Sequence, residues 1–454
     1  MIKGRENQTT IFALASGRGR AGVAVVRLSG PLAGKALKTL IGKGLPEPKM
    51  ASLVELKSPE SEGIIDKCII LWFPGPDSFT GEDVVELQIH GSPAIIDKLS
   101  EVLSDLGLRP AAPGEFSRRA FENGKMDLTQ AEGLHDLVLA ETEAQRKQAL
   151  YQLGGGLSEI YSAWRDGLVD CLADIEATID FSDEEIPVGL LDKVGFGVNA
   201  LKEGVENILG DFERGQAIRR GFKIVLLGPT NVGKSSLLNA LAREEKAIVS
   251  NIPGTTRDAI EVHLNLAGYA VVLVDTAGLR EAGDAIEEEG IRRALGHARE
   301  ANLKLLLCEA SAWPNLPREF ENQLGPDAII VLTKVDEAPG KPSETKPGSG
   351  LESVSISSKT GQGLDKLIEF LGNRVVEALE ASAPAGLTRV RHKQALGQAL
   401  DALVRFQGHD LVGTDPAILA EDLRLAARAM ASITGEVGVE EILGKIFSQF
   451  CIGK

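Results

Sequence analysis

The stretch FKIVLLGPTNVGKSSLLNAL, from Phe222 to Leu241, constrains the fold more than any other part of this chain. An unbroken apolar run leads into the pattern G-x-x-x-x-G-K-S, which spans Gly228 to Ser235 and precedes helix-like sequence. A glycine-bearing loop between a buried strand and a helix turns its N–H groups toward phosphate, at the positive end of the helix. A strand-to-helix turn without a ligand is the alternative, and this context disfavours it. We therefore expect a parallel α/β domain with a phosphate-binding loop.

Two further elements fit a triphosphate site that contains a metal ion. Lys234 of the loop would reach the β- and γ-phosphates, and Ser235 would bind Mg²⁺. The element GTTRD supplies Thr256, a candidate second ligand of Mg²⁺. The element VVLVDTAG ends an apolar run with Asp275, able to hold Mg²⁺ through water, and Gly278, whose N–H can meet the γ-phosphate. The loop and these elements together predict a nucleoside triphosphate site.

A third element concerns the base. AIIVLTKVD places Asp336 after another buried strand, where a carboxylate can accept from the ring N–H and the amino group of guanine. Adenine cannot match that pair of donors, and polar mismatches of this kind discriminate strongly. VSISSKTGQGL is expected to close over the base. Thr333 stands where the usual Asn-Lys-x-Asp pattern has asparagine, and a hydroxyl cannot replace an amide. The sequence predicts GTP, with lower guanine affinity than usual.

The spacing of apolar residues divides the chain into three kinds of sequence. Residues 1–121 mix β-like runs such as GVAVVRLSG and DVVELQIHG with helical pieces, which is typical of an α+β domain. Residues 122–216 and 380–454 carry apolar residues every three or four positions, as helices do. Residues 217–379 contain the phosphate loop. We expect a multidomain α/β chain in which the α/β domain is inserted into a central helical domain.

The net charge of −16 over 454 residues argues against a nucleic-acid surface covering the whole protein. The basic segments at 389–393 (RVRHK) and 219–221 (RRG) could still touch RNA phosphates, although ordinary helix-face charge explains them equally well. The four cysteines are far apart in sequence and predict neither a structural zinc site nor a disulfide framework. No apolar run reaches the length of a membrane span, and the amino terminus lacks a signal-peptide core. We expect a cytoplasmic protein without membrane contact.

Four segments outside the phosphate loop indicate a family. They are LWFPGPDSFTGEDVVELQIHGSP, RPAAPGEFSRRAFENGKMDLTQAEGL, DTAGLREAGDAIEEEG and the terminal SITGEVGVEEILGKIFSQFCIGK. Together they resemble the MnmE (TrmE) family of tRNA-modification GTPases, from near Thr10 to Lys454. The terminal FCIGK is unusually specific, whereas GTTRD is shared with Era-like ribosome-assembly GTPases.

The resemblance implies a homodimer with three kinds of domain. These are an N-terminal folate-binding domain similar to aminomethyltransferases, a central α-helical domain and an inserted Ras-like G domain. It also implies an FAD-containing partner, MnmG (GidA), in a heterotetramer that adds aminomethyl or carboxymethylaminomethyl groups to carbon 5 of wobble uridine in certain tRNAs. The one-carbon donor would be 5,10-methylene-tetrahydrofolate, with 5-formyl-tetrahydrofolate as its analogue. GTP hydrolysis would require Mg²⁺ and K⁺ and would accompany association of the two G domains.

Leu279 raises the question of what positions the attacking water. Ras-like GTPases use a glutamine directly after the Asp-x-x-Gly element, and a leucine side chain forms no hydrogen bond. The resemblance assigns the role to Glu287 through a bridging water, although Glu288 and Glu289 leave the alignment open by one residue. From the residues alone, a solvated acidic helix start is the better reading. By resemblance, K⁺ takes the place of an arginine finger, and its ligands are Asn231, Ser250, Ile252 and Thr255.

The motifs and the resemblance together give the predicted nucleotide site. Mg²⁺ is expected on Ser235 and Thr256, and Lys234 is expected to act with Glu287 in catalysis. The predicted GTP contacts are Asn231, Val232, Gly233, Lys234, Ser235, Ser236, Ser250, Asn251, Ile252, Pro253, Gly254, Thr255, Thr256, Asp275, Thr276, Ala277, Gly278, Thr333, Lys334, Asp336, Ser357, Ser358 and Lys359.

Folate binding is expected by resemblance at four positions, namely Arg27, Glu86, Lys125 and Lys454. A reduced folate needs hydrogen bonds for its pterin and cations for its glutamyl carboxylates. Taken singly, each of these residues is more typical of a surface charge or an ion pair. The resemblance also places Cys451 near the folate pocket as a catalytic thiolate, whereas a lone thiol on a helix is usually a small buried hydrophobe.

Two other classes of function compete with this interpretation. An Era-like switch that binds ribosomal RNA predicts an appended KH module, and we find no such module after the G domain. A stand-alone folate aminomethyltransferase would leave the GTP site unused. Bound folate separates the first alternative from the tRNA-modification GTPase, and GTP turnover separates the second.

Overall fold

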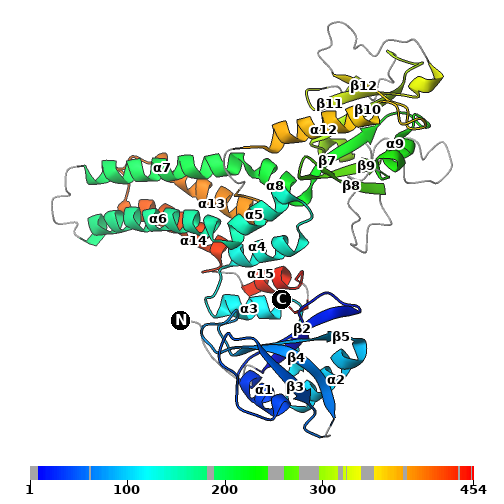
Figure 1. The fold of residues 1–454 in the computed structure, drawn as a ribbon. Helices are drawn as coiled ribbons and strands as arrows, with labels where there is room; N and C mark the ends of the chain where they lie inside the picture. The colour runs from blue at the N-terminus through cyan, green and yellow to red at the C-terminus, as the bar shows by residue number, and fades with distance from the viewer. Residues whose placement is uncertain are drawn as a thin grey trace. The chain divides into compact units, whose positions relative to one another are not determined.

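The structure is a computed structural model, and it describes residues 9–60, 63–180, 189–243, 260–275, 296–314, 321–323, 325–338, 352–381, 386–437, 440–450 and 452–453 (Figure 1). The chain forms two compact units. The first contains Met1–His135, Ser158–Arg165 and Ala427–Lys454, and the second contains Asp136–Leu157 and Asp166–Ala426. The boundaries predicted at residues 121, 216 and 379 are finer than this division and stay predictions.

The first unit is built on a six-stranded sheet with the order β3-β4-β5-β2-β1-β6. Its strands are β1 (Ile11–Leu14), β2 (Ala21–Ser29), β3 (Ser52–Lys57), β4 (Ile64–Phe73), β5 (Val84–Gly91) and β6 (Arg109–Pro110). Neighbouring strands are antiparallel, except for the short β1–β6 pair, which is parallel. Burial alternates along β4, because successive side chains point to opposite faces of the sheet. One face therefore holds the main core, while the other is exposed along β3 and β4 and is covered at β1 by a smaller cluster that includes Phe116.

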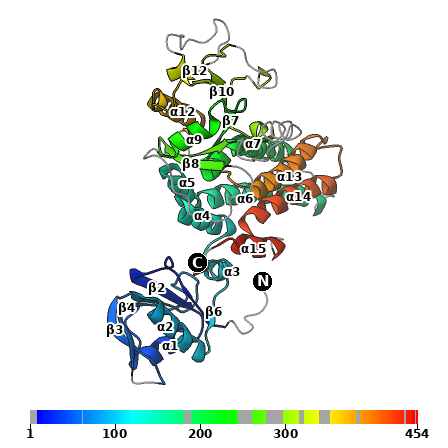
Figure 2. The same cartoon turned by 90° about the vertical axis from the view of Figure 1, so that its right-hand side faces the viewer.

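Two helices, α1 (Ala33–Ile41) and α2 (Pro93–Asp105), cover the buried face of this sheet. Figure 2 shows this sheet together with α1 and α2. Leu37 and Leu40 of α1 and Leu99 of α2 are fully buried among the inward side chains of the strands. Burying one such leucine contributes about 1.5–3 kcal/mol relative to leaving it exposed. This core fixes the strands that carry Arg27 and Glu86, two of the four candidate folate residues, on their opposite face.

Three helices that lie in the first unit in whole or in part pack against one another. They are α3 (Glu115–Glu122), the first part of α4 (Leu128–Leu139) and α15 (Glu440–Phe447). Leu128 and Ala131 of α4 form an apolar cluster with Leu443 and Phe447 of α15 and with Phe450, and the partly buried Phe121 of α3 packs against it. This packing joins the last helix of the chain to the helices that follow the N-terminal sheet.

The second unit contains most of the remaining helices. They are α5 (Glu143–Leu153), α7 (Leu190–Gly210), α8 (Phe212–Arg220), α12 (Leu364–Leu379), α13 (Val390–Gln407) and most of α14 (Pro416–Thr434). α6 (Gly156–Asp180) belongs to both units, since its residues 158–165 lie in the first. Among the residues that the structure describes, no helix combines the length and the apolarity needed to cross a membrane.

The second sheet has six strands in the order β12-β11-β10-β7-β9-β8. They are β7 (Phe222–Leu227), β8 (Ile260–Leu266), β9 (Tyr269–Asp275), β10 (Leu303–Glu309), β11 (Ala328–Thr333) and β12 (Ser353–Ser355). All neighbouring pairs are parallel except β8 and β9. Every residue of β11 is buried, as is typical of a parallel sheet with both faces covered. With α9 (Lys234–Leu241) and α12 packed on one face, the predicted α/β domain is confirmed.

Glutamines of α5 hold the chain on both sides of this second sheet. The Gln148 Nε2 donates a hydrogen bond to the Gly215 carbonyl at 3.3 Å, before β7 begins. The Gln152 Nε2 donates to the Gly386 carbonyl at 3.3 Å, after α12 has ended. Residues four apart lie on one face of a helix, so the two segments that flank the sheet domain are held by the same helix face.

Asp136, near the end of α4, forms a second link between the same two segments. One carboxylate oxygen accepts from Arg219 Nε at 2.8 Å, and the other accepts from Arg389 Nη2 at 2.8 Å. Both arginines belong to the basic segments 219–221 and 389–393, which the sequence indicated as candidate RNA contacts. Their mostly buried side chains are ion-paired inside the unit, which favours a structural role for them.

Candidate active site

The phosphate loop joins β7 to α9 and contains three residues with positive φ. They are Gly228 (φ 148°), Asn231 (φ 62°) and Gly233 (φ 106°). A Cβ on Gly228 would lie 2.6 Å from the Leu307 carbonyl oxygen, so only glycine fits there. Asn231 is one of the few residue types other than glycine that tolerates a left-handed conformation. The backbone is therefore held in a conformation that the sequence favours at each of these positions.

Lys234 lies inside the loop at the start of α9. Its buried ammonium donates hydrogen bonds to the carbonyls of Gly228 at 2.6 Å and Pro229 at 2.7 Å. Burial lowers the pKa of Lys234 from its ordinary value, and the charge of Asp275 opposes that shift. An ammonium carries three N–H groups, so one remains for an oxygen of a phosphate. The contact of Lys234 with the β- and γ-phosphates stays a prediction.

The two predicted oxygen groups of the metal site meet directly. Ser235 lies in the first turn of α9, and its Oγ donates to Asp275 Oδ2 at 2.7 Å. Asp275 is buried and ends β9, which pairs with β7 in parallel. A hydroxyl beside a carboxylate is the kind of oxygen set that Mg²⁺ prefers, so the residues present fit this ion.

Thr333 ends β11 beside the phosphate loop. Its side chain is buried, and its Oγ1 donates to the Val232 carbonyl at 2.7 Å. The residue that the sequence compared with a base-binding asparagine therefore contacts the loop. The predicted loss of guanine affinity stays a prediction.

The predicted base-recognition residues lie together after β11 and β12. Asp336 lies in a short 3-10 helix, η1 (Val335–Glu337), and a hydrogen bond from Ser357 lowers the pKa of its carboxyl. Burial opposes that shift, while the charge of Lys359 supports it. A carboxylate held ionised in this way is a ready acceptor for two N–H groups of a base. Residues from two separate motifs thus lie together, and their contact with a base stays a prediction.

Sequence reasoning missed a partner of Lys334. That residue has a left-handed backbone, with φ of 56°, and its ammonium forms an ion pair with Glu309. Glu309 ends β10 directly beside Thr333 in the parallel register. A charged residue closing the apolar run LKLLLCE is the signal that could have indicated it.

Many predicted nucleotide contacts lie outside the described residues. These are Ser250, Asn251, Ile252, Pro253, Gly254, Thr255, Thr256, Thr276, Ala277 and Gly278, together with Leu279 and Glu287. The second Mg²⁺ ligand, three of the four K⁺ ligands and the water-orienting carboxylate therefore stay predictions. Asn231, the remaining K⁺ ligand, is exposed in the phosphate loop.

Two of the predicted folate residues form a cross-strand pair in the first unit. Arg27 of β2 lies opposite Glu86 of β5, and its Nη2 is 2.8 Å from Glu86 Oε1. The Arg27 guanidinium carbon lies 5.3 Å from the ring centroid of Phe79 and 5.8 Å from that of Phe116. Sequence reasoning did not indicate these two aromatic rings, because they come from a loop and a helix far along the chain.

The other predicted folate residues have different outcomes. The exposed Lys125 lies beside Gly81, since its Cε would be 3.2 Å from a Cβ at that position. Arg27 Nη1 reaches the Gly453 carbonyl at 3.5 Å, which brings the end of the described chain to the Arg27–Glu86 pair. Lys454 and Cys451 lie outside the described residues.

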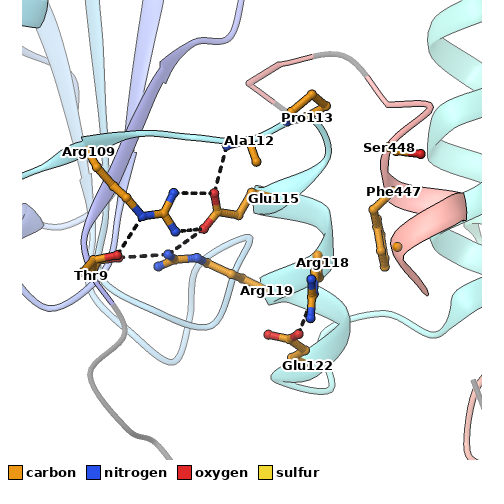
Figure 3. Close-up of a pocket in the computed structure, with 11 residues that line it drawn as sticks. Thr9, Arg109, Ala112, Pro113, Glu115, Arg118, Arg119, Glu122, Phe447 and Ser448 are labelled. Atoms are coloured by element: carbon orange, nitrogen blue, oxygen red, sulfur yellow. Dashed lines mark hydrogen bonds and ion pairs between the residues drawn. The ribbon is translucent and has the colours of Figure 1, made fainter. Parts of the chain in front are cut away.

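A cavity of about 570 Å³ lies between α3 and α15 in the first unit (Figure 3). Glu115 lies between Arg109 and Arg119 there, with its carboxylate 2.5 Å from Arg109 Nη2 and 2.9 Å from Arg119 Nη2. Burial raises the pKa of Glu115, but hydrogen bonds from Arg109, the Ala112 N–H and Arg119 outweigh it and lower the pKa to about 2. These arginines are engaged by carboxylates, which favours a structural role for them.

The geometry around β7, α9 and β9 is that of a P-loop nucleotide-binding domain. This protein is therefore a P-loop nucleotide-binding protein in which helices flank that domain in sequence. Two family models match the chain. One is described as the MnmE helical domain and matches residues 128–451, and the other is described as the GTP-binding protein TrmE N-terminus and matches residues 10–125. The chain belongs to the MnmE family of tRNA modification GTPases, as predicted from the sequence.

Individual relatives agree over nearly the whole chain. The tRNA modification GTPase MnmE of Parvibaculum lavamentivorans is 48% identical over 446 residues, covering 98% of this chain and 100% of that protein. The protein of the same name from Paramagnetospirillum magneticum is 50% identical over 447 residues, covering 98% of this chain and 99% of that protein. Among solved structures, the G domain of the T. maritima FeoB iron transporter is 27% identical, covering 35% of this chain and 98% of that chain, with a TM-score of only 0.25. The family assignment rests on the sequence matches.

Proposed function

We propose that this GTPase hydrolyses GTP at the phosphate loop and that hydrolysis serves the modification of wobble uridine in tRNA. The observation that carries the proposal is the convergence of Lys234, the Ser235–Asp275 pair and the Asp336–Ser357 pair around one edge of a parallel sheet. Ligands bind at the carboxyl ends of the strands in sheets of this kind. Each pair lies at the carboxyl end of a strand. The residues proposed to bind the phosphates, the metal ion and the base therefore all lie at the same end of the sheet's parallel strands.

In the proposed reaction, the chain acts by positioning and electrostatics. Phosphoryl transfer to water needs charge stabilisation on the phosphate oxygens and an oriented nucleophile, and little covalent chemistry from the protein. Lys234 and the loop N–H groups bind the phosphates. Ser235 and Thr256 would hold Mg²⁺, which would supply positive charge beside the phosphate oxygens. Asp336 accepts from the guanine edge, with Ser357 fixing its carboxylate.

The water and the cation at the loop complete this proposal. Leu279 offers no hydrogen bond, so we assign the orientation of water to Glu287 and charge compensation to K⁺. The exposed side chain of Asn231 supports a cation at the loop, since its amide oxygen is a hard ligand. Ser250, Ile252 and Thr255 would supply the other oxygens. In this scheme the two G domains of a homodimer associate during hydrolysis.

The open face of the N-terminal sheet supports the proposed homodimer. Leu53 of β3 is 65% exposed and is the register partner of Ile69 of β4, which is 41% exposed. Val23 of β2 is also exposed on this sheet. Exposed apolar side chains that are neighbours on a sheet, as Leu53 and Ile69 are, are a common sign of a protein–protein interface. We propose that a second copy of the chain covers them.

The one-carbon chemistry is assigned to the N-terminal domain. We propose an aminomethyltransferase-like folate site in which Arg27, Glu86, Lys125 and Lys454 bind methylene-tetrahydrofolate, with Cys451 beside it. The support is the Arg27–Glu86 pair, whose guanidinium lies near the rings of Phe79 and Phe116 and whose polar groups suit the hydrogen-bonding edge of a pterin. MnmG (GidA) would supply FAD, and the two proteins together would bind tRNA.

A GTPase assay in KCl and in NaCl at matched ionic strength tests the proposal. We expect faster turnover in KCl and a specific activity that rises with protein concentration, because the cation and G-domain pairing act together. Equal rates in both salts would remove K⁺ from the mechanism, and concentration-independent activity would remove pairing. A folate-binding titration on the same preparation separates this function from an Era-like ribosome-assembly switch, which has no use for folate.

A further inference from the structure

Thr333 and Asp336 belong to one sequence element but make different contacts. The Thr333 side chain is 2% exposed and donates to the Val232 carbonyl of the phosphate loop at 2.7 Å. Asp336 lies three residues later, against Ser357. We propose that Thr333 is a positioning residue that fixes the phosphate loop through Val232, and that it sets affinity for the phosphates and leaves base selection to Asp336. This inference rests on the proposed nucleotide site.

The backbone around Val232 explains why the loop needs an outside donor. Its neighbours Asn231 and Gly233 both have positive φ, so the backbone on each side of Val232 is in a conformation that an extended strand or a helix does not adopt. A loop that turns successive N–H groups toward a phosphate turns its carbonyls the other way. Those of Gly228 and Pro229 accept from Lys234, while that of Val232 accepts from Thr333.

The Val232–Thr333 contact lies in a buried setting. The Val232 side chain is part of the main apolar core of the second sheet. A buried carbonyl that loses its donor is left unsatisfied, which is unfavourable, and the loop would have to rearrange to avoid that loss. The Thr333 hydroxyl therefore stabilises the one loop conformation in which the N–H groups face the phosphates.

The chemistry of a hydroxyl separates this role from base binding. Threonine has a single O–H hydrogen, and Thr333 directs it to backbone carbonyls, with a second, longer contact to Cys308 at 3.4 Å. An asparagine at this position has two N–H hydrogens and a carbonyl, enough for the loop and the base together. With threonine, the loop contact is kept and the hydrogen available to the base is given up.

The test uses the full-length chain and the variant Thr333→Val, which keeps the shape and removes the hydroxyl. Displacement of a fluorescent GDP is measured with GDP, with inosine diphosphate and with inorganic tripolyphosphate, which has no base. We expect all three to bind about tenfold more weakly, the change that corresponds to about 1.4 kcal/mol, with the GDP-to-inosine-diphosphate ratio unchanged. Thr333→Ser restores the hydroxyl and is expected to restore all three affinities.

Thr178→Val is the matched control, because the Thr178 hydroxyl is also buried and donates to a backbone carbonyl, that of Ile175, at 2.7 Å in a distant helix. It is expected to leave all three affinities unchanged. Weaker GDP binding with normal tripolyphosphate binding in Thr333→Val would assign Thr333 to the base and overturn the inference, as would normal binding of every ligand. The variant Lys234→Ala separates a failure of the Thr333 inference from a failure of the proposed nucleotide site. Normal GDP binding in Lys234→Ala would refute the nucleotide site itself.

Discussion

Replacing Glu115 with glutamine isolates one charge in the cavity between α3 and α15. The Glu115 side chain is 12% exposed and bridges Arg109 and Arg119. Its pKa falls from the ordinary 4.5 to about 2 in the folded protein. That difference, roughly 2.5 pH units at 1.36 kcal/mol each, corresponds to about 3 kcal/mol of stability. Glu115→Gln is therefore expected to destabilise the first unit by about 3 kcal/mol at pH 7.

The pH dependence follows from the direction of the shift. A carboxyl whose folded-state pKa is lowered contributes fully above its unfolded pKa of 4.5 and loses that contribution as the pH falls through about 2. The difference in the free energy of unfolding between the native chain and Glu115→Gln is thus expected to shrink to about 1 kcal/mol near pH 3. Below pH 2 the native carboxyl is neutral as well, and the two proteins should converge.

Hydrogen exchange measured peptide by peptide is the suitable assay, because a chain with two compact units does not guarantee a single unfolding transition. The free energy of opening is read from the amides of β2 and β5. Glu122→Gln on the same helix is the control, since Glu122 is 33% exposed and its pair with Arg118 is of the surface type, worth at most about 1 kcal/mol. Equal losses in the two variants at pH 7, or a loss in Glu115→Gln that persists unchanged at pH 2, would refute the reasoning.

Three further predictions concern the proposed chemistry. Glu287→Ala is expected to abolish GTP turnover while leaving nucleotide affinity nearly unchanged, and near-normal turnover in a steady-state phosphate-release assay would move the role to a neighbouring carboxylate. Cys451→Ser is expected to reduce tRNA modification sharply and to spare GTP hydrolysis; an unchanged content of modified uridine, measured by nucleoside mass spectrometry, would remove the thiol from the mechanism. Arg27→Ala is expected to weaken binding of 5-formyl-tetrahydrofolate at least tenfold in calorimetric titration, because Glu86 then lacks its cation. Full affinity in that variant would place the folate elsewhere.

The phosphate loop and its sheet could be predicted from the sequence because their signals are local. The β7 run ends in the loop glycines, and the β11 run is buried along its whole length, so each strand is recognisable alone. Lys234, Ser235 and Asp275 follow from motifs whose spacing is fixed by the strand and helix that carry them. The structure places Ser235 Oγ 2.7 Å from Asp275 Oδ2, and their role at a metal ion stays a prediction.

Contacts between distant segments could not be predicted in the same way. The pairing of Arg27 with Glu86 depends on the register of β2 and β5, and the two aromatic rings near Arg27 come from other elements. Thr333 shows the limit most clearly, because its motif indicates a base contact. The direction of its hydroxyl is set by how closely β11 approaches the loop, which no local pattern encodes.

The hydrogen bonds of Gln148 and Gln152 have a consequence for how this architecture arose. The backbone at Gly215 and at Gly386 is held within about one turn of the same helix, roughly 6 Å along its axis. When the two insertion points of a domain lie so close together, the inserted domain can be of almost any length, since closing a longer loop costs little extra entropy. The same proximity makes the helical part a practical recipient for grafted domains, joined to it by a linker of only a few residues.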